Sequence, residues 1–145
     1  MDAFDFLLNL DEDRILAAIR QAERRTSGEI RVFVSDAKVA DPVAAAEREF
    51  VRLGMTATRD RNGVLIFVAP RSRNFAIVGD EGVHARCGQR FWDQVSAAMR
   101  REFHSELMTD AIILGIARSA ELLARHFPRS PDDVNELPDV IARGR

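Results

Sequence analysis

The chain has 145 residues, of which 46% are hydrophobic and 30% charged, and this balance predicts one globular domain with a substantial core. Its formal net charge of −2 argues against a nucleic-acid-binding protein, which usually carries a basic face. Cys87 is the only cysteine, which excludes an internal disulfide and a thiolate zinc cluster. The sequence has no signal-peptide pattern and no apolar run of ~18 residues, so we expect a cytoplasmic protein without a membrane span.

The first part of the chain predicts a helix, a strand and a second helix. Asp11 is a suitable N-cap for the first helix, which ends at residues 26–28. Ile30, Val32 and Val34 then alternate with Glu29, Arg31 and Phe33, and this period of two predicts a strand with one clearly buried face. The second helix begins at Asp41-Pro42, with the acid as cap and proline at the first helical position. Its predicted apolar stripe consists of Val43, Ala46, Phe50 and Leu53.

Two further strands follow in the middle of the chain. Residues 64–69 are continuously apolar, which is typical of a central strand covered on both faces. Together with the preceding strand and helix they predict a βαβ unit, with two parallel strands and a right-handed crossover. The short turn at residues 70–73 suits only an antiparallel neighbour, which we place at residues 74–78. The predicted sheet is therefore mixed.

The last part of the chain returns to helical spacing, over residues 89–103 and again from about 108 to 127. Pro128 closes the last helix. We therefore expect one domain over residues 1–128 and a C-terminal tail over residues 129–145, partly docked or disordered. The predicted fold class is α/β, a three-layer α/β/α sandwich with a small mixed β-sheet.

The predicted strand directions bring polar residues from distant parts of the sequence to one edge of the sheet. These residues are Glu29, Asp60, Asn62, Asp80 and Glu81. Carboxylate and amide oxygens are the ligands that hard divalent cations prefer. Asp93, on the next helix, could project back to the same edge. The alternative is that the cluster consists of solvated turn residues and that Asp93 is an exposed helical acid.

Three other groups of polar residues are weaker candidates. Asp36 follows the carboxyl end of the first strand, where α/β sheets usually bind ligands. His84 lies near Asp80 in the sequence and could bind a metal or carry protons, although a lone histidine in a turn usually does neither. Arginines that could steer an anion alternate with other residues in a pattern that usually marks a solvated surface: Arg31, Arg71 and Arg73.

Several short motifs, in this order and spacing, resemble the TPM domain family. They are Thr26-Ser27-Gly28-Glu29-Ile30, Arg61-Asn62-Gly63-Val64-Leu65-Ile66, Gly79-Asp80-Glu81-Gly82-Val83 and Phe91-Trp92-Asp93. The ending, His126-Phe127-Pro128 with Asn135-Glu136-Leu137-Pro138-Asp139, is similar to that of the short, free-standing bacterial branch. The resemblance implies an α/β/α sandwich and, in some members, calcium or another divalent ion bound by acidic residues.

Carried over by position, the resemblance implies Glu29, Asp80 and Asp93 as metal ligands, with calcium as the favoured ion. Long-form members often have an acid where Arg61 stands here, and an arginine at this position would repel a cation. Other members include a thylakoid-lumen acid phosphatase.

We therefore expect a divalent-cation-binding or interaction module with a possible protein partner, whose oligomeric state the sequence leaves open. The alternative is a metal-dependent acid phosphatase acting on phosphomonoesters, with Arg61 or Arg73 as the phosphate partner. A third possibility is a purely structural adaptor. No catalytic residue is identified at this point.

Overall fold

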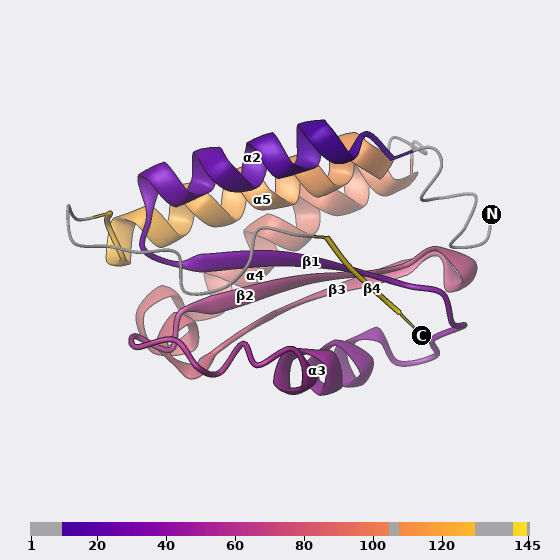
Figure 1. Cartoon of the computed structure of the whole chain (residues 1–145), viewed down its shortest axis with the longest axis horizontal. Coiled ribbons are helices and arrows are strands. Elements are labelled where there is room, and N and C mark those ends of the chain that lie inside the picture. Colours follow the sequence, from indigo (N-terminus) through magenta and orange to yellow (C-terminus); the bar gives the residue numbers. More distant parts are fainter. Residues whose placement is uncertain (1–9, 105–107, 130–140, 145) are drawn as a thin grey trace.

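A four-stranded mixed sheet forms the middle layer of the computed structural model, which describes residues 10–104, 108–129 and 141–144 (Figure 1). The strand order is β3-β2-β1-β4. β1 (Glu29–Ser35) pairs in parallel with β2 (Gly63–Ala69) and with β4 (Ile141–Gly144). β2 pairs with β3 (Asn74–Gly79) in the antiparallel direction, across the single 3-10 turn η1 (Pro70–Ser72). The predicted parallel βαβ unit and the predicted mixed sheet are confirmed.

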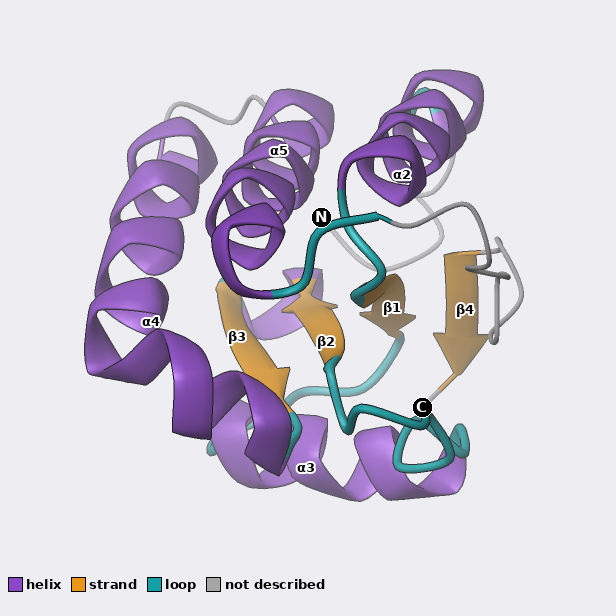
Figure 2. Ribbon diagram, turned by 90° about the vertical axis from the view of Figure 1, so that its left-hand side faces the viewer, coloured by secondary structure: helices purple, strands orange, loops and turns teal. Residues whose placement is uncertain are grey.

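Helices cover both faces of this sheet, as Figures 1 and 2 show. α2 (Glu12–Arg25), α4 (Glu81–His104) and α5 (Met108–His126) lie on one face, and α3 (Pro42–Arg52) lies on the other. The sheet therefore separates two apolar cores. One core contains Val32 and Ile66 against the three-helix layer, and the other contains Phe33 and Phe67 against α3. This arrangement confirms the predicted α/β/α sandwich.

β1 is buried on both faces, so the predicted single buried face is wrong. All seven of its residues are buried, including Glu29 and Arg31. The physical reason is that β1 has a parallel neighbour on each side and a helical layer above and below, like β2. Polar positions in its alternating pattern therefore face the α3 layer instead of water.

The predicted helix starts are confirmed where a side chain caps the helix. Asp11 Oδ1 accepts a hydrogen bond from Arg14 N at 3.1 Å, and Asp41 Oδ1 accepts one from Ala44 N at 3.1 Å. The predicted stripe of α3 is wrong at Val43, which is 52% exposed. Ala45 belongs to the buried face of α3, which turns that face away from Val43.

α4 begins earlier than the sequence predicted. It starts at Glu81 and is interrupted at Gly88, whose backbone has φ 70° and ψ −172°. The predicted helix over residues 89–103 corresponds to the part that follows this interruption. None of the helices in the described ranges is long and apolar enough to cross a membrane.

A short strand lies within the segment that the sequence analysis treated as a tail. β4 pairs with β1 from Val32↔Ile141 to Ser35↔Gly144, at the edge of the sheet opposite β3. Thr26 and Pro128 form an isolated antiparallel bridge where β1 begins and α5 has ended. The rest of the predicted tail, residues 130–140 and 145, lies outside the described residues, and with it the Asn135 to Asp139 motif.

Candidate functional site

The predicted edge of the sheet, at the amino ends of β1 and β2, does bring distant residues together. Glu29 pairs with Gly63, and Glu29 N donates to Asn62 O at 3.3 Å. Asp80 N donates to Gly63 O at 2.9 Å, because antiparallel β3 returns the chain to the start of β2. Glu29, Asn62 and Asp80 therefore lie at one edge, as the strand directions predicted.

At this edge, Arg61 forms an ion pair with the carboxylate of Asp80. Arg61 Nε lies 2.7 Å from Asp80 Oδ2, and Arg61 Nη2 lies 2.8 Å from Asp80 Oδ1. A third guanidinium nitrogen, Nη1, lies 3.3 Å from Glu81 Oε1. These hydrogen bonds to Asp80, with its charge and that of Glu81, raise the pKa of Arg61 above its ordinary value. A two-pronged pairing of this kind is the geometry that suits a guanidinium and a carboxylate best.

Asp80 immediately precedes α4 and caps its first turn. Its Oδ1 accepts a hydrogen bond from Glu81 N at 2.8 Å, and its carbonyl oxygen accepts from Val83 N at 3.0 Å and from His84 N at 3.3 Å. The Asp80 side chain is only 5% exposed. Both of its carboxylate oxygens thus have partners within the chain, and the negative charge sits at the amino end of a helix, where it is favourable.

Two backbone features let Arg61 reach Asp80. Arg61 has φ 50°, in the left-handed region, and this redirects the chain just before β2. Gly82 packs directly on the same loop, because a Cβ at this position would lie 2.3 Å from Asp60 O and 2.6 Å from Arg61 O. Gly82 N donates to Arg61 O at 2.9 Å. The start of α4 and the residues before β2 are therefore joined by a backbone hydrogen bond and by the Arg61–Asp80 ion pair.

Asn62 lies beside this ion pair and is almost completely buried, with 1% of its surface exposed. Its N–H donates to Thr58 Oγ1 at 3.2 Å, and its Nδ2 lies 3.5 Å from Ser27 Oγ. Its side-chain oxygen, Oδ1, has no hydrogen-bond partner in the part of the chain that the structure describes. A buried carbonyl oxygen without a donor is a group that a cation could use.

Asp93 and His84 lie on α4 and make contacts within that helix. Asp93 is exposed, and its Oδ1 accepts a hydrogen bond from Gln89 Nε2 at 3.1 Å. His84 Nδ1 accepts from Trp92 Nε1 at 3.2 Å, with the two ring centroids 4.9 Å apart. Within the described ranges, no three His, Cys, Asp or Glu side chains are grouped so that they could hold a metal ion. As placed, the residues around Asp80 fit a guanidinium, and a metal role for Glu29, Asp80 and Asp93 stays a prediction.

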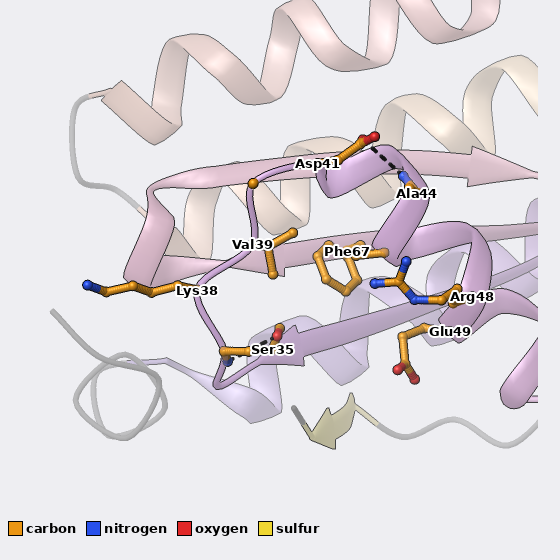
Figure 3. A pocket seen from close by; sticks show the side chains of 11 residues that line it. Ser35, Lys38, Val39, Asp41, Ala44, Arg48, Glu49 and Phe67 are labelled. Atoms are coloured by element: carbon orange, nitrogen blue, oxygen red, sulfur yellow. Dashed lines mark hydrogen bonds between the residues drawn. The ribbon is translucent and has the colours of Figure 1, made fainter.

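A cavity lies at the other end of the strands from Asp80, next to the carboxyl end of β1 (Figure 3). Its volume is about 360 Å³, it is open to solvent on one side, and it is bordered by the loop after β1, by α3 and by Phe67 of β2. The predicted candidate Asp36 lies between two lining residues, Ser35 and Ala37, but its own backbone groups are hydrogen-bonded outside the cavity lining. Asp36 N donates to Gly144 O at 2.6 Å, and its carbonyl oxygen accepts from Arg71 Nη1 at 3.4 Å. The tendency of α/β sheets to bind ligands beyond the carboxyl ends of their strands indicated this region. Nothing in the sequence pattern identified Lys38, Arg48 or Phe67 as lining residues of a cavity.

Arg31 lies in surroundings that its sequence pattern did not predict. Only 9% of it is exposed, so the expected solvated position is wrong. Its Nε has no hydrogen-bond partner among the described residues. Burial, followed by the positive charge of Arg52, lowers the pKa of Arg31 below its ordinary value. Arg52 itself lies over the Phe33 ring, with Cζ 5.8 Å from the ring centroid.

Comparison with known proteins agrees with this architecture. The family model for the TPM domain matches residues 1–122. The NMR structure of the BA42 protein from the psychrophilic bacterium Bizionia argentinensis is similar, with 38% sequence identity, a TM-score of 0.87 and 92% of each chain covered. The N-terminal domain of the cg2496 protein from Corynebacterium glutamicum shares the fold, with 18% identity and a TM-score of 0.60 over 75% of this chain and 68% of that one. No curated protein matches the sequence. The chain belongs to the TPM domain family.

Proposed function

We propose that this domain is a non-catalytic binding module in which the Arg61 guanidinium supplies the positive charge that a metal ion would otherwise bring to Asp80. The observation that carries the proposal is the pair of short contacts from Arg61 Nε and Nη2 to the two Asp80 oxygens, at 2.7 and 2.8 Å. A metal ion at Asp80 would have to displace this guanidinium or bind next to it. An arginine side chain stays protonated at any physiological pH, so the repulsion would be permanent.

The groups at this edge also support a role without hydrolysis. Metal-free hydrolysis of a phosphomonoester would need a side chain free to act as a base toward water or as a nucleophile toward phosphorus. The Asp80 carboxylate is held by Arg61 and Glu81 N, and His84 Nδ1 accepts the Trp92 indole proton. Because Nδ1 is an acceptor, the other ring nitrogen of neutral His84 carries the proton and cannot act as a base. Both groups are thus engaged in holding the start of α4.

Titration calorimetry with calcium and with magnesium tests this proposal on the whole chain. We expect no binding heat and no thermal shift for the native protein at millimolar ion concentrations. The Arg61→Asp variant should gain divalent-ion binding, because it replaces the guanidinium by a carboxylate next to Asp80 and Glu81. Arg59→Asp is the matched control, since Arg59 is an exposed neighbour and the charge change is the same. The control should not gain binding.

Calcium binding is the second candidate function, and the buried Asn62 Oδ1 without a partner in the described part favours it. Saturable calcium binding by the native protein that disappears in Asp80→Asn would overturn the first proposal and support this one. Metal-dependent turnover of an aryl phosphate, abolished by Glu29→Ala or Asp80→Ala, would instead support the phosphatase. The two assays together assign the domain to one of the three functions.

A further inference from the structure

The cavity beyond β1 has the position and size of a small ligand site. Open α/β sheets usually bind ligands beyond the carboxyl ends of their parallel strands, and β1, β2 and β4 all end at this edge. The volume of about 360 Å³ lies within the range of roughly 300–1,000 Å³ that is typical of ligand pockets. The cavity is at the opposite end of β1 from the Arg61–Asp80 pair, so the two sites can be tested separately.

The charged side chains that line the cavity differ in how they are engaged. The two acids have partners: Asp41 Oδ1 accepts from Ala44 N, and Glu49 Oε2 accepts from Arg52 Nε at 2.5 Å. The two cations, Lys38 and Arg48, make no hydrogen bond or ion pair within the ranges that the structure describes. Arg52 compensates the charge of Glu49, whereas the Asp41 carboxylate keeps its charge, so the two cations exceed the uncompensated acid by one positive charge.

The apolar part of the wall is rigid. Phe67 is 1% exposed and stacks on Phe33, with ring centroids 5.6 Å apart and planes 6° from parallel. Figure 3 shows the Arg48 side chain beside Phe67, while Lys38 extends outward from the loop on a flexible stem. Ser35 is buried at the end of β1, and its Oγ accepts from Ala37 N at 3.2 Å, which leaves the hydroxyl hydrogen to donate.

We propose that this cavity binds a small organic anion, with its carboxylate or phosphate on Arg48 and its apolar body against the half-buried Val39 and Ala44. Arg48 offers the planar pair of donors that both anions accept, and Lys38, which extends outward from the loop, adds positive charge near the opening. The Ser35 hydroxyl supplies a neutral donor deeper in the cavity. This inference rests on the proposed function, since it gives the binding module a class of ligand.

Nuclear magnetic resonance titration of the whole, ¹⁵N-labelled protein tests the proposal with benzoate and phenyl phosphate as probes. We expect saturable shifts of the Ala37, Val39 and Ala44 amides with at least one probe, and the stronger probe identifies the preferred anion. Arg48→Gln should weaken this binding about tenfold or more, as expected for the loss of a charged hydrogen bond. Arg20→Gln, on exposed α2 across the sheet, is the matched control and should bind like the native protein.

Two further probes separate the contributions of charge and ring. Benzyl alcohol keeps the ring without the charge, and inorganic phosphate keeps the charge without the ring, so both should bind at least tenfold more weakly. Equal binding of either one, an unchanged affinity in Arg48→Gln, or no saturation by about 10 mM of any probe would overturn the proposal. Calcium binding at Asp80 would refute the proposed function without moving the shifts at residues 37–44, so the two failures are distinguishable.

Discussion

Replacing Arg31 with methionine should stabilise the domain. Arg31 is 9% exposed, its Nε has no partner among the described residues, and Arg52 adds a like charge nearby. A buried donor that has lost water without gaining an acceptor lowers the free energy of unfolding. Methionine has a similar length, is flexible enough to fill the same space, and brings no polar group.

The expected gain in the free energy of unfolding follows from Arg31 Nε, the buried donor without an acceptor among the described residues. Leaving a buried donor unsatisfied costs about 1–3 kcal/mol, and replacing buried charges by apolar side chains is often stabilising by a similar amount. Because a long side chain also contributes packing that the substitution changes, we expect a gain of about 1–2 kcal/mol. For a chain of this length the melting temperature should rise by about 3–6 °C.

Urea and thermal unfolding followed by circular dichroism measure this gain. Arg20→Met, at an exposed position on α2, is the control and should change the free energy of unfolding by less than about 0.5 kcal/mol. The guanidinium is protonated in both folded and unfolded states between pH 5 and 9, so the gain should not vary over that range. A loss of stability in Arg31→Met, or a gain equal to that of the control, would refute the reasoning.

Three further predictions concern the region from Gly82 to Trp92. Gly82→Ala should lower the free energy of unfolding by about 1–3 kcal/mol, because the new Cβ would meet Asp60 O at 2.3 Å; unchanged urea stability would contradict the packing described. Burial raises the pKa of the Cys87 thiol, so alkylation by iodoacetamide at pH 7.5 should be slower than that of a free cysteine and should accelerate as the pH rises, whereas an equal rate would argue against burial. His84→Ala should shift the fluorescence of Trp92, the only tryptophan, to longer wavelength as water replaces the imidazole acceptor; an unchanged spectrum would show that the two rings do not interact in solution.

The features predicted from the sequence are those that a few neighbouring residues determine. Asp11 and Asp41 cap helices within three residues of themselves, and the β-branched apolar run before Pro70 is typical of a central strand. The antiparallel hairpin then places Asp80 beside the start of β2, because the connection at η1 is too short for any other pairing. Local chemistry and strand direction were therefore sufficient for the layers and for the edge where Glu29 and Asp80 lie.

The features that were not predicted depend on contacts between distant residues. β4 has four residues and no apolar run, and it is a strand because β1 offers an open edge, which no local pattern reveals. The burial of Arg31, which pairs with Leu65 of β2, likewise depends on neighbours that are distant in the sequence. The ion pair of Arg61 with Asp80 requires a left-handed backbone at Arg61 and the missing Cβ of Gly82, and both become visible only in three dimensions.

The strand order has a consequence for how the domain is made. The ribosome synthesises β4 after all the other described elements, yet β4 pairs with β1, the first strand. Until β4 arrives, β1 carries unpaired N–H and C=O groups along Val32–Ser35, which are a template for pairing with another chain. A nascent or truncated chain that stops before Ile141 would present this edge, and self-association through it would compete with completion of the sheet. The short strand β4 thus covers the paired part of β1 as well as completing the sheet.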